Sequence, residues 1–141
     1  MPNPKVIEFP LGTQYNLQYH FKQIEVSSAE LLAINGAPKS LVVAPGAGNI
    51  IFPINVAAYL HFGTVVYATN ISIDIRHTTG TNYLMSLAGL IDKAADRIVG
   101  AASQYTPLII NEPLILTEPT GDPTGGDGTL TIYLWYINLE L

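Results

Sequence analysis

The strongest constraint in this sequence is a run of alternating apolar residues near its middle. In "NIIFPINVAAYLHF", residues 49–62, every even position is apolar, and in "VVYATNISIDIRH", residues 65–77, most odd positions are. A period of two is typical of a β-strand with one buried face. Because the buried parity changes across Gly63 and Thr64, the pattern predicts a long antiparallel hairpin from Asn49 to His77 with a two-residue turn there.

Further strands are predicted on both sides of this hairpin. Residues 16–26, "NLQYHFKQIEV", alternate with Leu17, Tyr19 and Phe21 inward and then change parity, which predicts an edge or corner strand with a β-bulge near Lys22 or Gln23. Residues 112–118, "EPLILTE", and 129–141, "TLTIYLWYINLEL", flank the loop "PTGDPTGGDG". A loop rich in Gly, Pro and Asp between two apolar runs predicts a second hairpin.

One segment has helical spacing instead. In "YLMSLAGLIDKAADRIVGAAS", residues 83–103, apolar residues recur every three or four positions and charged residues occupy the other side. The apolar positions are Leu84, Leu87, Ile91, Ala94, Ile98 and Ala102. This spacing predicts one amphipathic helix whose apolar stripe packs on the sheet.

The glycine pair in "VVAPGAGNIIF", residues 42–52, is the sequence's closest approach to a phosphate-binding loop. A Walker loop needs Lys and Ser or Thr after its last glycine, and a dinucleotide fingerprint needs a third glycine and a helix. Neither is present. We therefore expect "PGAGN" to be a turn between a short strand at residues 40–44 and the strand that begins at Asn49, with Pro45 and Gly46 supplying its dihedral angles.

Composition narrows the classes of function. Only 12% of the residues are charged, the net charge is −5, and the six Lys and Arg residues form no basic stripe, so nucleic acid is not an expected partner. The chain has no cysteine, which removes thiol nucleophiles and zinc–thiolate sites. No apolar run is long enough to span a bilayer and the start lacks a signal peptide, so we expect a soluble chain without a membrane partner. A poorly charged surface suits a protein that works inside an assembly, although an ordinary small β-domain fits the composition equally well.

Residues that carry catalytic or metal chemistry are sparse. His20, His61 and His77 lie on separate predicted strands without metal-ligand spacing. Asp122 and Asp127 in the polar loop are close in sequence but lack the spacing and terminal Glu of a calcium loop. No Ser stands in a G-x-S-x-G setting, and the glutamates show no pairing that the sequence can reveal. Those glutamates are Glu8, Glu25, Glu30, Glu112, Glu118 and Glu140. We expect no enzyme activity, no cofactor and no bound metal.

Three segments together resemble a known family. The order "AELLAINGAPKSLVVAPGAGNIIF", then "FGTVVYATN", then "NEPLILTEPTGDPTGGDGTLTIYLWY" is similar to small structural proteins of tailed bacteriophages, from residue 28 to 136. Their pattern has "P-x-x-L-V-x-A-P-G-A-G-K", a "Y-G-T" turn and "G-D-G-T-L" before an aromatic strand, and Asn49 stands where a basic residue is usual. The resemblance implies a virion component, such as a head-decoration, head-fibre or other capsid-associated protein, with a jelly-roll-like sandwich.

The predicted fold is therefore an all-β, jelly-roll-like antiparallel sandwich with one inserted amphipathic helix. Residues 1–15 are predicted to form an extended arm, kept from central-strand pairing by Pro2, Pro4 and Pro10, and residues 16–141 a single domain. A frayed terminus is the alternative for the arm. The predicted function is structural, through packing against copies of itself and against other virion proteins such as the major capsid protein.

The C-terminal strand predicts where such packing occurs. Both of its faces carry large apolar residues, and on the odd-numbered face these are Tyr133, Trp135, Ile137 and Leu139. Two apolar faces need two covers, and a neighbouring subunit is one candidate for the second. We expect a homo-oligomer, most simply a trimer by analogy with other virion sandwiches. In the alternative, the predicted helix and the arm of the same chain cover this face.

A carbohydrate- or receptor-binding module of a fibre tip is the alternative function. Sugar sites in sandwich folds need exposed aromatic rings beside Asp or Asn side chains. Tyr105, Tyr133 and Trp135 are the candidate rings.

Overall fold

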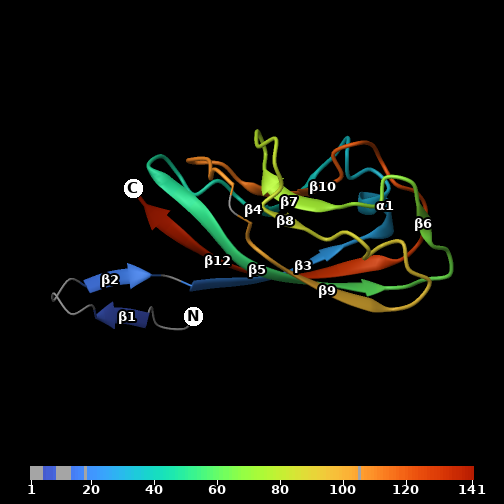
Figure 1. The fold of residues 1–141 in the computed structure, drawn as a ribbon, viewed down its shortest axis with the longest axis horizontal. Coiled ribbons are helices and arrows are strands. Elements are labelled where there is room, and N and C mark those ends of the chain that lie inside the picture. The colour runs from blue at the N-terminus through green and yellow to red at the C-terminus, as the bar shows by residue number, and fades with distance from the viewer. Residues whose placement is uncertain (1–4, 9–13, 18, 105) are drawn as a thin grey trace.

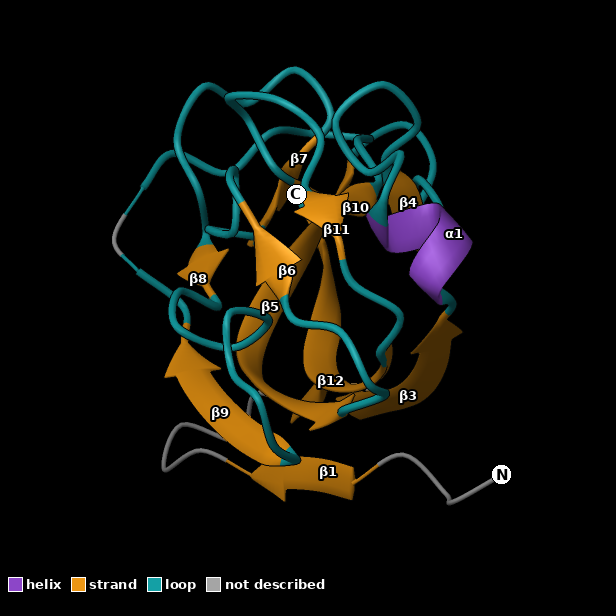
Figure 2. Cartoon of the chain, turned by 90° about the vertical axis from the view of Figure 1, so that its right-hand side faces the viewer, coloured by secondary structure: helices purple, strands orange, loops and turns teal. Residues whose placement is uncertain are grey.

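The computed structural model describes residues 5–8, 14–17, 19–104 and 106–141, and two antiparallel sheets of four strands face each other across its core (Figures 1 and 2). The first sheet has the order β3-β12-β5-β9 and is called here the long-strand sheet. Its strands are β3 (Tyr19–Val26), β12 (Thr129–Glu140), β5 (Asn49–His61) and β9 (Arg97–Ala102). The prediction that β3 is an edge strand is confirmed.

The second sheet is built from much shorter strands and is called here the short-strand sheet. Its order is β4-β10-β7-β8. The strands are β4 (Lys39–Val42), β10 (Leu114–Thr117), β7 (Asp74–His77) and β8 (Met85–Ser86). Figure 2 looks along the sandwich and shows this sheet as the upper layer above the long-strand sheet.

The strand order identifies a jelly roll. Numbered along the chain, the eight strands of the two sheets give the orders 1-8-3-6 and 2-7-4-5, and each connection except that from β7 to β8 crosses between the sheets. Eight antiparallel strands wound in this way form the double-sheet jelly roll. The predicted all-β, jelly-roll-like sandwich is confirmed.

Smaller elements complete the described chain. A two-stranded sheet of β6 (Tyr67–Ala68) and β11 (Thr124–Gly125) lies at one end of the sandwich (Figure 2). The single turn α1 (Ser28–Leu31) joins β3 to β4 and begins with a capping box, in which the side chain of Ser27 and that of Glu30 each accept from the other's backbone N–H.

The N-terminal segment contains a separate pair of strands. β1 (Lys5–Glu8) pairs antiparallel with β2 (Gln14–Leu17), which leads into β3, and Figure 1 shows this pair extending beyond one end of the sandwich. Pro2, Pro4 and Pro10 lie outside the described residues. An arm that docks on a neighbouring molecule stays a prediction.

The core lies between the two sheets and is almost wholly aliphatic. Inward residues of the long-strand sheet, such as Leu60 and Leu134, and of the short-strand sheet, such as Ile75 and Leu116, are at most 1% exposed and belong to one continuous cluster. Such burial is the main favourable contribution to folding. The loop after β4 turns at Gly46 and Gly48, both at positive φ, which confirms that "PGAGN" is a turn.

The predicted hairpin from Asn49 to His77 is wrong. β5 pairs with β12 and β9, whereas β7 lies in the other sheet and pairs with β10 and β8. The second predicted hairpin is wrong for the same reason, since β10 and β12 also belong to opposite sheets. Inward side chains of two successive strands can meet across the core as well as on one sheet face. The alternation therefore identifies the buried face of a strand but not its neighbour.

The predicted helix over residues 83–103 is also wrong. This segment contains β8, an irregular connection and β9. Leu84, Leu87 and Ile91 are fully buried as predicted, but Ile98 is 64% exposed on β9. Gly89 adopts a left-handed φ of 73° in the middle of the segment, which is incompatible with a continuous helix.

The predicted bulge in β3 is absent from the described residues, because β3 pairs with β12 in one unbroken register. The bulge occurs instead in β5, where Trp135 lies opposite Asn55 but Tyr136 lies opposite Pro53. Pro53 lies beyond the part of β5 that pairs with β9, so its missing N–H breaks no bond on that side.

Candidate interaction surface

The outer face of the long-strand sheet carries the residues predicted for an oligomer interface. On β12 the even-numbered residues from Leu130 to Leu134 face the core and are fully buried, so the odd-numbered ones face outward. The predicted interface residues are Tyr133, Trp135, Ile137 and Leu139, and the structure places all four on this outer face. Trp135 is 38% exposed and the other three are half-buried.

Two aromatic residues of β3 extend this apolar surface. Register places Phe21 opposite Trp135 and Tyr19 opposite Ile137, and Phe21 and Tyr19 are 54% and 55% exposed. The ring of Phe21 lies 5.2 Å from that of Trp135 and 6.3 Å from that of Tyr133, measured between centroids. Cross-strand aromatic pairs at such distances stabilise one another and form a rigid group.

The bulge in β5 adds a further aromatic residue to the same face. Before the bulge the inward residues of β5 include Ile51, and after it they are Val56, Ala58 and Leu60, so the parity shifts by one. Phe52, which the alternation placed inward, lies opposite Ile137 and is 39% exposed. We call the group of Tyr19, Phe21, Phe52, Tyr133, Trp135 and Ile137 the aromatic face.

Polar groups border the aromatic face toward the His61 end of β5. Glu25 accepts a hydrogen bond from the Thr131 hydroxyl at 2.9 Å. The Tyr59 hydroxyl donates to Asp96 at 2.7 Å, and this bond raises the pKa of Tyr59 and lowers the pKa of Asp96. An apolar centre with a polar edge is the usual composition of a protein interface.

The alternative to a partner was that another part of the same chain covers this face. Ile91, the centre of the predicted helix, lies in the core and is fully buried, so it does not cover the outer face. The exposure of Tyr19, Phe21 and Trp135 shows that the described part of the chain leaves the aromatic face open to solvent.

The three histidines make different contacts. The His61 ring is hydrogen-bonded to the Thr131 hydroxyl at 2.8 Å, and the His20 ring stacks on Tyr136 at 4.9 Å between centroids. His77 is 1% exposed, and burial lowers its pKa, although the nearby Pro113 backbone and Glu112 carboxylate act in the opposite direction.

The acidic residues serve mainly as acceptors for loop backbone. Asp122 accepts from the N–H groups of Asn35 and Gly36, whereas Asp127 accepts from those of Thr64 and Val65. The two carboxylates therefore hold different segments.

Three of the six glutamates have comparable anchoring roles. Glu118 accepts from the N–H groups of Thr120 and Gly121, and Glu112 accepts from the N–H of Thr79 at 2.9 Å. Glu30 caps α1 and pairs with Lys39, which lowers its pKa to about 2. Glu140 is exposed at the end of β12, and Glu8 lies in β1.

Two of the three candidate sugar-binding rings lie within the described residues. Tyr133 and Trp135 lie side by side on β12's outer face, with Gln23 and Asn55 opposite them. Tyr105 lies outside the described residues.

Among the described helices, none is long and apolar enough to cross a membrane.

Comparison with known proteins assigns this chain to no family. No protein-family model matches the sequence, and no curated protein sequence does either. Among solved structures, the capsid of Ralstonia phage GP4 is similar over 86% of this chain and 83% of that chain, with 13% sequence identity and a TM-score of 0.46. A likeness at this level does not assign the chain to a family.

Proposed function

We propose that this chain is a non-enzymatic structural protein of a phage virion that acts by packing against copies of itself through the aromatic face. The observation that carries the proposal is the group of neighbouring aromatic side chains that are partly exposed to solvent on a sheet whose other face packs on the core. Monomeric proteins rarely leave contiguous apolar patches exposed, and such patches usually mark interaction sites.

Two further features support this proposal. Jelly rolls are common among viral capsid domains, although a fold alone does not determine a function. The sequence also resembles tailed-phage structural proteins over residues 28–136. A role in capsid decoration or in a head fibre, contact with a major capsid protein and residence in the virion are the finer parts of the proposal.

The oligomeric state provides the first test. A trimer gives a mass of three times 15.2 kDa in light scattering coupled to gel filtration, and Trp135→Glu should return it to a single chain because it places a charge in the buried centre of the contact. Val43→Glu is the matched control, since Val43 is 72% exposed but lies just after β4 in the other sheet. A wild-type mass of 15.2 kDa at micromolar concentration would refute self-association.

Location in the particle requires a separate experiment. Cryo-electron microscopy of the purified virion should show this jelly roll bound to the capsid or its fibres, with the aromatic face covered. Its absence from the particle would contradict the virion role while leaving self-association intact.

A carbohydrate-binding role for the aromatic face is a second candidate. It is favoured by the exposed rings of Phe21 and Trp135 beside the amide side chains of Gln23 and Asn55. Trp135 is the single tryptophan of the chain, so its fluorescence reports on this face alone. Saturable quenching by host surface polysaccharide would support this candidate, and unchanged emission would exclude it.

A further inference from the structure

The free edges of the two four-stranded sheets are a second region of interest, because an edge strand presents unpaired backbone N–H and C=O groups to any strand that comes beside it. β3 and β9 form the edges of the long-strand sheet, and β4 and β8 form those of the short-strand sheet. Figure 2 shows β3 and β9 at opposite sides of the lower layer. Proteins usually protect such edges with charged side chains, irregular pairing or very short strands.

Three of these four edges are protected in such ways. On β3, Lys22 belongs to the row of residues that faces the other sheet, and its ammonium group donates to the Leu41 carbonyl at 3.3 Å. β4 begins with Lys39, and its pairing with β10 contains a shift of register. β8 has only two residues. None of these three strands offers a long edge that is free of charge.

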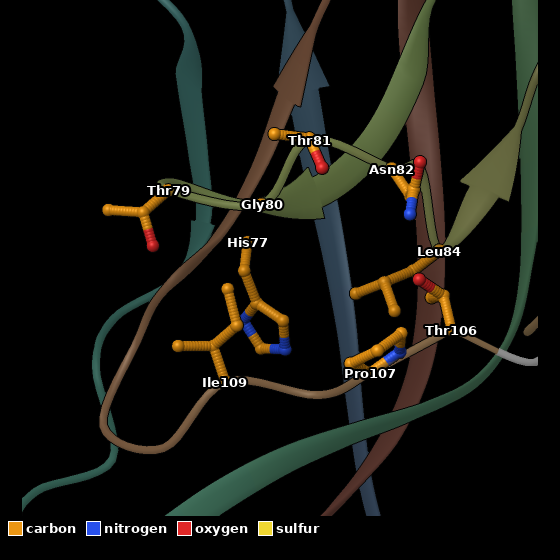
Figure 3. Close-up of a pocket in the computed structure, with 9 residues that line it drawn as sticks. All are labelled: His77, Thr79, Gly80, Thr81, Asn82, Leu84, Thr106, Pro107 and Ile109. Carbon is orange, nitrogen blue, oxygen red and sulfur yellow. The ribbon is translucent and has the colours of Figure 1, made fainter.

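Loop residues also line two pockets close to β8. The turn that leads from β7 to β8 and the segment before β10 line a pocket of about 160 Å³, and Figure 3 shows Thr79, Asn82 and Ile109 around it. A second pocket of about 220 Å³ is lined by Asn82, Tyr83 and Gln104, among others. The surroundings of β8 are therefore shaped by loops, and this edge does not continue as a strand.

β9 lacks all three forms of protection. It has six residues, and after Arg97 at its start none is charged and none is proline. It pairs with β5 in one unbroken register. Ile98, Gly100 and Ala102 are exposed, and the exposed fraction of Ile98 is 64%. Among the edges of the described four-stranded sheets, β9 is therefore the one that stays open for pairing.

The backbone groups of β9 point alternately toward β5 and away from it, because antiparallel strands alternate between hydrogen-bonded and non-hydrogen-bonded pairs. The Ser103 N–H, one residue beyond β9, donates to the Ile54 carbonyl at 3.1 Å, and the register places these two residues opposite each other. The even-numbered residues of β9 therefore direct their N–H and C=O groups away from β5. Those groups of Ile98, Gly100 and Ala102 have no hydrogen-bond partner within the part of the chain that the structure describes.

The sequence of β9 is complementary to a second copy of itself. When two copies run antiparallel about a two-fold axis at Gly100, the outward backbone groups of each strand meet those of the other. On the outer face of the sheet, Ile98 then lies beside the small Ala102 of the second copy. On the inner face, Val99 lies beside Ala101, and both residues already pack against the core. Each large side chain thus meets a small one.

We propose that β9 pairs antiparallel with β9 of a second copy about a two-fold axis at Gly100, which joins their four-stranded sheets into one continuous sheet. The same register places Arg97 beside the uncharged Ser103, so no like charges meet. Such a contact is isologous, since the same patch serves on both chains. It lies at the edge of the sheet opposite β3, so it is separate from the aromatic face and does not rest on the proposed function.

Amide exchange with solvent, measured by nuclear magnetic resonance, tests this inference. The ¹⁵N-labelled full chain carries Trp135→Glu, which removes the proposed contact through the aromatic face. One strand pair buries less area than a stable interface, so we expect a dissociation constant on the order of 100 μM and about fivefold slower exchange at Ile98, Gly100 and Ala102 in a 1 mM sample than in a dilute one. The odd-numbered amides, already bonded to β5, should exchange slowly at every concentration. If the Trp135→Glu chain does not fold, the same amides are measured in the wild-type chain.

Charges at residue 100 distinguish self-pairing from pairing with another strand. Gly100→Lys places two ammonium groups opposite each other across the axis and should weaken the dimer about fivefold. The fold accommodates this side chain, because a Cβ at Gly100 meets only the Val56 carbonyl oxygen, at 3.7 Å. An equal mixture of Gly100→Lys and Gly100→Glu should restore slow exchange at Ile98 and Ala102, since opposite charges then face each other. Val43→Lys, at an exposed position beyond β4, adds the same charge and should leave the exchange of β9 unchanged.

Two results would overturn the inference. The first is exchange at Ile98 and Ala102 that does not depend on protein concentration, or slowing that is confined to β3. The second is a mixture of Gly100→Lys and Gly100→Glu that behaves like either variant alone, which would mean that β9 is covered by a different strand or by none. Both results leave self-association through the aromatic face intact, because the mass of the wild-type chain measures that contact separately.

Discussion

The two sheets of this sandwich both contribute to one core but differ in what covers their outer faces. The long-strand sheet has strands of 13 and 12 residues at its centre, and its outer face presents the aromatic face to solvent. The short-strand sheet has no strand longer than 4 residues among those described. Its strands β7 and β10 are buried on both sides and contain the buried polar residues Asp74, His77 and Thr117.

This difference indicates that the two sheets have different roles. Long strands make a continuous outer face that a second protein can cover. Short strands give way to long connections, and these fold back over the sheet and are anchored by buried polar groups such as Glu118. The first arrangement suits assembly and the second suits shaped cavities.

Truncation of the shared core should have the largest effect and should be equal in the two sheets. Leu134→Ala on β12 and Leu116→Ala on β10 each remove a fully buried side chain, so each should lower the free energy of unfolding by about 2–5 kcal/mol. Ile98→Ala on β9, where the side chain is exposed, should change it by no more than about 0.5 kcal/mol. Urea denaturation measures all three, and two separate transitions would show that the sheets unfold independently.

Substitutions in the loops that cross from the short-strand to the long-strand sheet should have the next largest effect on stability. Gly48, before β5, and Gly126, before β12, both have positive φ, so alanine at either position should cost about 1–2 kcal/mol. Gly126→Ala should cost more, because its Cβ would overlap a ring carbon of buried Tyr67, whereas nothing lies within 4 Å at Gly48. Equal losses of melting temperature would contradict the crowded packing at Gly126.

The short-strand sheet buries polar groups, so its contribution to stability should depend on pH. Burial lowers the pKa of His77 below its ordinary value of 6.5, so as pH falls below 6.5 the unfolded chain binds a proton that the folded chain resists. Stability from this residue is therefore complete above pH 6.5 and decreases below it. His77→Leu should flatten the dependence of the urea midpoint between pH 7 and 5. An unchanged slope in the variant would exclude His77 as the titrating group.

The surface ion pair between α1 and β4 should have the smallest effect on stability. Lys39 at the start of β4 pairs with Glu30 of α1, and both side chains are partly exposed. Lys39→Met should lower the free energy of unfolding by no more than about 1 kcal/mol at neutral pH. Because the pKa of Glu30 is lowered from 4.5 to about 2, its contribution should disappear as pH falls from 4.5 toward 2. A larger loss at neutral pH would show that the pair also positions α1.

The sequence predicts the fold class and the outward residues of β12 but not which strands are neighbours. The alternation at residues 56–60 and 130–134 matches the burial of β5 and β12, because both strands pack one face on the core. Pairing depends on which sheet each crossing reaches, and local periodicity does not encode this. The resemblance to phage proteins, in contrast, implied the correct jelly roll.

The candidate surfaces were predictable to different degrees. The apolar residues on both faces of β12 indicated, from the sequence alone, that something covers its outer face. Tyr19 and Phe21 were assigned to the inner face instead, because the sequence analysis placed a bulge in β3 that the structure has in β5. The pocket that Asn82 and Gln104 line could not be predicted, since separate loops and no sequence motif place these two residues beside it.

The position of β12 has a consequence for how the protein is made. β3 and β5 leave the ribosome early, yet both need β12, from Thr129 onward, as the strand between them. A nascent chain therefore holds the apolar strand β5 without its main partner until almost all of the domain has been synthesised. Pairing between segments so distant in sequence is slow. A chain interrupted before Thr129 loses the strand on which the whole long-strand sheet is assembled, and we expect it to aggregate rather than to fold in part.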